Sequence, residues 1–216
     1  YELTTPLFTD YAHKDRFVFL PPGQAADYRR DGPLDFPVGT IIAKTFSYPE
    51  DERRPAAGRK VIETRLLIHR PDGWIGLPYL WNTDRTEARL ALGGAVRKVT
   101  WRDLGGAERV VDYRVPSRNK CTSCHGGAAG DLPIGPKAGL LNRDGQLQAW
   151  ARMGKLTSLP NAPGLVPRIP AWNDPRDGTL SERARAYLDV NCAHCHQPGG
   201  RARFSAMYLE YDRDPT

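Results

Sequence analysis

The sequence predicts an α+β protein in which a β-rich N-terminal domain is followed by a mainly α region, and three observations support this division. Up to residue 116, runs of β-branched and aromatic residues alternate with turn residues. Beyond residue 116, glycine, alanine and proline become common and β-branched residues become rarer. A strong helix-start signal then appears near residue 180. We therefore expect two domains, 1–116 and 117–216.

At least six segments of the first domain are expected to be strands, because they are rich in β-branched and aromatic residues and are bounded by turns. Pro71-Asp72-Gly73 favours a hairpin between two of them, and Leu104-Gly105-Gly106 favours another. Six strands without a convincing helix indicate an antiparallel sandwich- or barrel-like unit. The expected strands are 17–20, 40–48, 61–69, 74–81, 95–101 and 109–115.

The second domain carries two helix signals on either side of a proline-rich segment. A short helix is expected over 144–153, with its apolar residues on one face and Gly154 placed to end it. The segment 159–175 contains too many prolines for regular structure and would link elements or wrap around a cofactor.

A second helix is expected to begin at Thr179 and to run directly into Cys192. Thr179 and Glu182 have the spacing of a capping box, in which each side chain accepts a hydrogen bond from the other residue's backbone amide. The apolar stripe expected on this helix consists of Leu180, Ala184, Tyr187 and Leu188.

All four cysteines belong to two motifs of the form Cys-x-x-Cys-His, at 121–125 and 192–196. This spacing lets two thiols add across the two vinyl groups of one haem while the adjacent imidazole binds its iron. The motifs therefore predict two covalently bound haem c groups. The expected thioether ligands are Cys121, Cys124, Cys192 and Cys195, and the expected proximal ligands to iron are His125 and His196.

Zinc is the main alternative, because paired Cys-x-x-Cys knuckles also form tetrahedral zinc sites, and a redox-active dithiol pair is a further one. The two motifs are separated by far more than the roughly 15–20 residues usual for a zinc ribbon. A histidine also follows each of them, which the zinc alternative does not require.

The sequence offers fewer candidates for the remaining ligands and contacts of iron. For His125, the segment Gly135-Pro136 is placed to accept a hydrogen bond from the ring nitrogen that does not bind iron, and no acceptor can be named for His196. The only methionines are Met153 and Met207. Met153 is the preferred candidate for a distal ligand, whereas Met207 is more easily explained as a core or surface residue.

A helix that leads directly into Cys-x-x-Cys-His is how class I cytochrome c domains begin. Such a domain also needs a distal loop and a closing helix after the motif, but only residues 197–216 follow His196. The second haem would therefore be completed by the first half of this chain, by a partner or by a C-terminal part outside this sequence. We favour the last, in which the second haem domain is incomplete at the C-terminus.

Charge and hydropathy indicate a soluble globular protein without a transmembrane segment. Lysine and arginine exceed the acidic residues by six charges, which would suit an acidic redox partner, and no motif supports nucleic-acid binding. The sequence has no N-terminal signal peptide, although haem attachment through thioethers requires export. We therefore expect a mature chain, or a fragment of one, in the periplasm or outside the cell. The oligomeric state is not predicted.

Several blocks along nearly the whole chain resemble a bacterial family of exported di-haem c-type cytochromes, most of whose members are known only as conserved proteins of unknown function. The resemblance implies a β-rich N-terminal part, two covalent haems and an extracytoplasmic location, but it implies no reaction. Members of the family are typically longer at both ends. The blocks are YELTTPLFTDYAHKDRF, FPVGTIIAKTF, IETRLLIHRPDGWIGLPYLWN, CTSCHGG, PIGPKAGLLNRDGQ and RARAYLDVNCAHCH.

The function that these features predict is one-electron transfer by a di-haem c-type cytochrome without catalysis at the protein. One alternative is a haem enzyme that resembles a di-haem peroxidase, with an open sixth site on one iron. Another is a partner-docking β module with a redox output. The scarcity of methionine keeps the enzyme alternative open.

Overall fold

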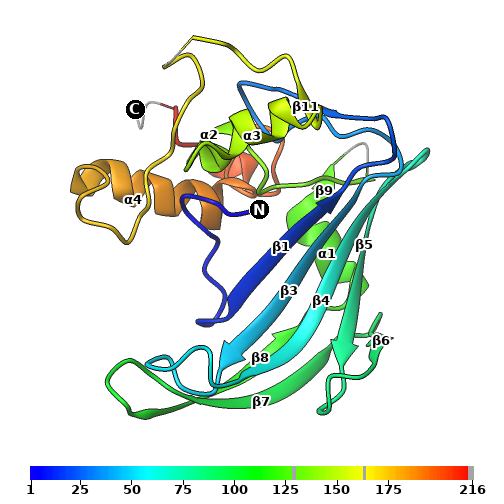
Figure 1. Ribbon diagram of the computed structural model, residues 1–216, viewed down its shortest axis with the longest axis vertical. Helices are drawn as coiled ribbons and strands as arrows, with labels where there is room; N and C mark the ends of the chain where they lie inside the picture. The colour runs from blue at the N-terminus through cyan, green and yellow to red at the C-terminus, as the bar shows by residue number, and fades with distance from the viewer. Residues whose placement is uncertain (128–129, 163, 214–216) are drawn as a thin grey trace.

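The computed structural model describes residues 1–127, 130–162 and 164–213, and its main feature is a strongly curved, largely antiparallel sheet (Figure 1). The strand order is β1-β3-β4-β5-β10-β9, and β6 pairs with the C-terminal end of β5, on the side away from β4. A short parallel pair, formed by β2 (Ala26–Asp27) and β11 (Leu156–Thr157), lies outside this sheet. The sheet consists of β1 (His13–Phe19), β3 (Ile41–Pro49), β4 (Arg59–Arg70), β5 (Gly73–Trp81), β6 (Ala88–Leu90), β9 (Gly126–Gly127) and β10 (Gly130–Asp131).

Both hairpins predicted from turn residues are present. Strands β4 and β5 pair in a register that places Arg70 opposite Gly73, and Gly73 has a φ of 113°, which glycine adopts without strain. The second hairpin joins β7 (Ala95–Arg102) to β8 (Glu108–Val115), and Gly106 in its turn also has a positive φ. Local turn chemistry therefore determines these two pairings.

The prediction of a sandwich or barrel is wrong for this β-rich part. Strands β7 and β8 form a sheet of their own that crosses one end of the main sheet (Figure 1). A single bridge between Asp51 and Arg102 connects the two. Aromatic packing holds this end together, because Tyr48, Trp101 and Tyr113 are buried and contact one another at ring-centroid distances of 5.0 and 6.0 Å.

The prediction of a mainly α cytochrome-like region after residue 116 is also wrong. The structure is mostly β, with 31% strand and 17% helix. Prolines and glycines keep the described chain between the helices extended, so the helices remain short. They are α1 (Arg118–His125), α2 (Ala138–Leu141), α3 (Gln146–Arg152) and α4 (Leu180–Leu188), with a π-helical turn at Asp189–Ala193 and a 3₁₀ turn at Arg203–Ser205.

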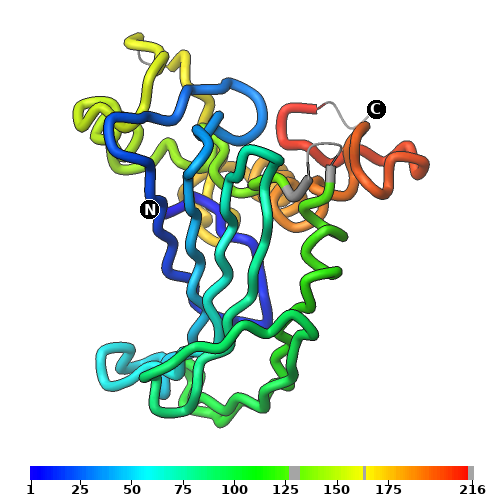
Figure 2. The backbone as a smooth tube through the Cα atoms, turned by 90° about the vertical axis from the view of Figure 1, so that its right-hand side faces the viewer, coloured from blue at the N-terminus to red at the C-terminus, as the bar shows by residue number. Residues whose placement is uncertain are grey.

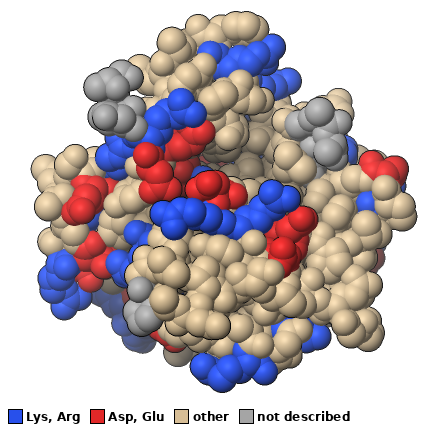
Figure 3. All heavy atoms as spheres, turned by 90° about the horizontal axis from the view of Figure 1, so that it is seen from above, with Lys and Arg blue, Asp and Glu red and all other residues tan. Residues whose placement is uncertain are grey.

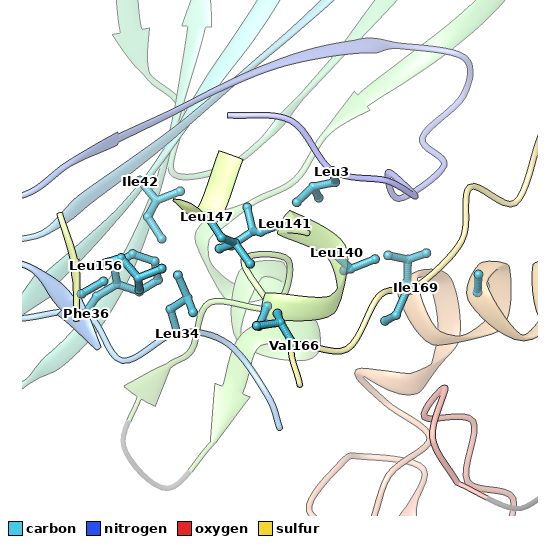
Figure 4. Packing of buried hydrophobic residues seen from close by; sticks show 14 of the residues in the cluster. Leu3, Leu34, Phe36, Ile42, Leu140, Leu141, Leu147, Leu156, Val166 and Ile169 are labelled. Carbon is cyan, nitrogen blue, oxygen red and sulfur yellow. The ribbon is translucent and has the colours of Figure 1, made fainter. Parts of the chain in front are cut away.

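The larger hydrophobic core is built from both sides of the boundary expected at residue 116. Leu140, Leu141 and Leu147 are fully buried, and they pack in the same cluster as Leu34 and Phe36 from the first part of the chain (Figure 4). Helix α3 supplies Leu147 to this core and ends before Gly154, as predicted. The boundary therefore marks a change in secondary structure, whereas the core is shared across it.

Helix α4 begins as predicted but buries a different face. Leu180 is 76% exposed and Leu188 is also exposed, whereas Ala186 is fully buried. Ala186 belongs to the larger hydrophobic core, and the buried side continues beyond α4 through Val190 and Ala193. The predicted apolar stripe is therefore wrong, because the buried face of the helix is rotated about the helix axis relative to that stripe.

The capping box at the start of α4 is confirmed and gives a direct stability prediction. The Glu182 amide donates to Thr179 Oγ1 at 3.2 Å, and the Thr179 amide donates to Glu182 Oε2 at 2.8 Å. Thr179→Ala is expected to reduce the free energy of unfolding by about 1 kcal/mol, as loss of an N-cap usually does. Urea denaturation would measure the change. Thr179→Ser keeps the hydroxyl and should behave like the wild type, and equal losses in both variants would contradict the capping role.

Candidate functional site

The first Cys-x-x-Cys-His motif lies on helix α1, which follows β8 directly and runs alongside the main sheet (Figure 2). No residue of α1 is fully buried, including Cys121 and Cys124. One helical turn spaces the two thiols, and His125 ends the helix. The helix therefore presents the three side chains together at the edge of the sheet.

The ring orientation of His125 is fixed by the chain that follows it. His125 Nδ1 lies 2.6 Å from the carbonyl oxygen of Leu132, so that the ring nitrogen carries the proton and donates. Nε2 then carries the lone pair that a metal would take. The prediction that Gly135-Pro136 supplies the acceptor is wrong, since the Pro136 carbonyl accepts from the Leu34 amide at 2.9 Å.

The second motif is built in the same way on the turn that follows α4. The amides of Cys195 and His196 both donate to the Cys192 carbonyl at 3.0 Å, which closes the turn around the two thiols. His196 Nδ1 lies 3.2 Å from the carbonyl oxygen of Met207. The acceptor for His196, which the sequence did not indicate, is therefore a backbone carbonyl eleven residues further along the chain.

The fold brings the two motifs together although about seventy residues separate them. The Cys124 and Cys195 thiols are hydrogen-bond neighbours, so one cysteine of each motif lies beside one of the other, and partial burial together with the Cys195 thiol raises the pKa of the Cys124 thiol. All four cysteines lie in the described part of the chain, and none of them forms a disulfide there.

A cavity of about 830 Å³ opens between the motifs. This volume lies within the range of roughly 300–1,000 Å³ that is usual for small-molecule and cofactor sites. Acidic and basic side chains are intermingled on the face of the molecule shown in Figure 3. The cavity is lined by Cys124 and His125 of the first motif and by His194 of the second. Leu132 and Ile134, which follow the first motif, also line it.

A buried ion pair fixes the second motif against the chain that follows the first. Lys137 Nζ donates to both carboxylate oxygens of Asp189, at 2.9 and 3.1 Å, and Asp189 is almost fully buried. The Tyr211 amide donates to the same carboxylate at 3.2 Å. Because Asp189 lies three residues before Cys192, this contact joins the start of the second motif to the chain that follows the first motif and to the C-terminal segment.

His194 lies between the two cysteines of the second motif and was not predicted to be a site residue. Its Nδ1 is buried and has no hydrogen-bond partner among the described residues, and its ring lines the cavity together with His125. A buried, unpartnered imidazole nitrogen facing a cavity is suited to binding a metal or a polar group there. Only its position between Cys192 and Cys195 could have pointed to it.

Both methionines are exposed, and neither lines the cavity that contains His125. Met153 is 62% exposed at the end of α3, and it does not line the cavity that contains His125. Met207 is 57% exposed and contributes its backbone carbonyl to His196. That contact places the Met207 backbone beside Nδ1 of His196, the ring nitrogen that would not bind a metal.

The donor set and its geometry fit covalent haem at both motifs. Each motif has two thiols spaced by a helical turn, and each adjacent imidazole has its Nδ1 paired with a carbonyl. In the described ranges there is no cluster of three or more histidine, cysteine and acidic side chains arranged to hold a metal ion. Nor does any helix of the described chain combine the length and hydropathy needed to cross a membrane.

Comparisons with protein-family models, with curated proteins and with solved structures gave no match to this chain.

Proposed function

We propose that this protein is an exported c-type cytochrome, similar to the bacterial di-haem family, which carries single electrons through two covalently bound haems. The observation that carries the proposal is the repeated geometry of the two motifs. In both, a helical turn presents two thiols and a histidine whose Nδ1 donates to a backbone carbonyl. A single histidine hydrogen-bonded in this way could have many roles. Two histidines with the same surroundings favour the same cofactor chemistry at both motifs.

Bound haem would supply an iron that cycles between the ferric and ferrous states. The chain's own residues would hold it. Cys121 and Cys124 would anchor one haem and Cys192 and Cys195 the other, while the Leu132 and Met207 carbonyls hold the two imidazoles in the required tautomer. The contact between Cys124 and Cys195 supports a close pair of haems, which suits electron transfer from one to the other.

A haem enzyme with one open iron site is the second candidate, and the positions of the methionines favour keeping it. Met153 and Met207 are both exposed, and neither lines the cavity that contains His125. The unpartnered nitrogen of His194 lies in this cavity instead. If His194 does not bind iron, the sixth position of the nearby haem is open to a small molecule.

Two measurements on the protein expressed in a host that attaches haem c test the proposal. The denatured intact mass should exceed the polypeptide mass by two haems, and the pyridine haemochrome spectrum should show haem c. A ferric spectrum that is wholly low-spin would support the electron carrier. A high-spin component that reacts with hydrogen peroxide would instead support the enzyme, and zinc with no haem would contradict both.

A further inference from the structure

One face of the main sheet carries a cluster of positive charges between the two hydrophobic cores. The strand register aligns Arg16 on β1, Lys44 on β3 and Arg65 on β4 as direct cross-strand neighbours. Lys14 lies two residues before Arg16 and therefore on the same face. We call Lys14, Arg16, Lys44 and Arg65 the cationic cluster.

The aromatic ring of Phe46 lies at the centre of this cluster and shows how closely its members gather. The Lys14 and Lys44 nitrogens lie 5.8 and 5.4 Å from the ring centroid, and the Arg65 guanidinium carbon lies 4.2 Å from it. Cation–π contacts of this kind stabilise a positive charge only modestly. Three cations around one ring also repel one another, so they need negative charge nearby.

The described residues supply too little negative charge for the cluster. Arg65 pairs with Glu63, and Arg16 lies 3.8 Å from Glu2. No ion pair joins Lys14 or Lys44 to a carboxylate within the described ranges, and Lys14 donates only to the Ala12 carbonyl at 2.9 Å. Two of the four cations therefore have no anionic partner.

Lys44 is the more exceptional of the two, because its ammonium group has neither a hydrogen bond nor an ion pair in the described chain. Burial, followed by the charges of Arg65, Arg16 and Lys14, lowers the pKa of Lys44 to about 7. Burying an ammonium group without a partner costs several kcal/mol, whereas pairing it with a carboxylate offsets much of that cost. The environment of Lys44 thus favours an added anion.

The cationic cluster lies beside the first Cys-x-x-Cys-His motif. The charge of Arg65 interacts with the thiols of both Cys121 and Cys124. Helix α1 contacts β5, the strand next to Arg65 in the sheet. A molecule attached to these two cysteines would therefore be within reach of the cluster.

We propose that Lys14 and Lys44 bind the two propionate carboxylates of the haem attached to Cys121 and Cys124, an inference that rests on the proposed function. The charges match, since two cations without an anionic partner would face two carboxylates. Arg65 and Glu63 remain paired to each other and support the site from one side. A free phosphate or small carboxylate is the competing source of the same negative charge.

The test compares Lys44→Met, Lys44→Arg and the exposed control Lys98→Met on β7. The midpoint potentials of both haems would be measured by spectroelectrochemical titration of the intact haem-containing protein. Loss of a cation near one haem stabilises its ferric state, so Lys44→Met should lower one of the two potentials. Lys44→Arg and Lys98→Met should leave both potentials unchanged. Lys14→Met provides a second variant with the same expected shift.

A haem count for each variant separates failure of this inference from failure of the proposed function. A wild-type protein without haem would contradict the proposed function itself. Two attached haems with unchanged potentials in both Lys44→Met and Lys14→Met would overturn only the propionate site. If inorganic phosphate raises the melting temperature of the wild type more than that of Lys44→Met, a free anion occupies the site, which also overturns the assignment to propionate.

Discussion

Glu63→Gln is expected to lower the free energy of unfolding by about 3–5 kcal/mol, because it breaks a buried charge network. Glu63 is 0% exposed and accepts hydrogen bonds from Tyr113 Oη at 2.6 Å and from Arg65 Nε and Nη2 at 3.0 and 2.6 Å. Glutamine has one oxygen to serve these donors, and its amide group would face the Arg65 guanidinium as a further donor. Arg65 would keep its charge without a counter-ion.

Urea denaturation monitored by circular dichroism would measure this loss, and Glu87→Gln is a suitable control. Glu87 pairs with Arg89 at 3.3 Å on the surface, where both side chains are mostly exposed. Such a pair contributes roughly 0–1 kcal/mol. Similar losses in the two variants would show that the Glu63 network does not support the sheet. Since Arg65 is 29% exposed, the effect should fall at the lower end of the range.

Replacing Cys192 and Cys195 with alanine is expected to remove one of two haems and to leave the other attached. The reason is that each thioether bond uses one thiol, so the double replacement removes both attachment points of one motif, and the second motif is a separate helical turn from the first. The denatured mass of the variant should be lower than that of the wild type by one haem, after correction for the two sulfur atoms. The pyridine haemochrome absorbance per polypeptide should fall accordingly.

The reciprocal variant, in which Cys121 and Cys124 are replaced by alanine, serves as the matched control. It should also lose one haem, and the variant with all four changes should lose both. An unchanged haem content in either pair variant would show that haem is not attached at that motif. Loss of both haems from each pair variant, with the fold retained, would contradict independent attachment at the two motifs.

Local signals in the sequence predicted the local structure well. The capping box at Thr179 and Glu182, the turn at Gly73 and the helix that ends before Gly154 all depend on residues within a few positions of one another. Such features form from backbone conformation and short-range hydrogen bonds. They could be predicted without knowledge of the rest of the fold.

Features that depend on distant pairing could not be predicted in this way. The cationic cluster exists because the register aligns Arg16, Lys44 and Arg65, and a shift of one residue would turn one of these strands' side chains to the other face. The carbonyl of Leu132 is an acceptor because the chain after His125 turns back onto the ring. The region after residue 116 was predicted to be mainly α from two short helix signals, whereas most of the described chain around those helices has no helical structure.

Likewise, the sequence identified the residues of the candidate site but not how the fold brings them together. Spacing alone identified Cys121, Cys124, His125 and their counterparts, because that pattern reflects the size of one cofactor. The proximity of Cys124 to Cys195 arises from packing between distant segments, to which the ion pair of Lys137 and Asp189 contributes. The position of a histidine between two cysteines did not reveal that His194 faces a cavity.

The core formed jointly by the two parts of the chain limits how this protein can be dissected. A fragment that ends at residue 116 would leave Leu34, Phe36 and Ile42 without the leucines that cover them, so we expect it to aggregate rather than to fold as an autonomous unit. The sheet therefore cannot act as a detachable recognition module. Any protein that docks on the sheet would do so on a scaffold whose stability already depends on the segments carrying both cysteine pairs.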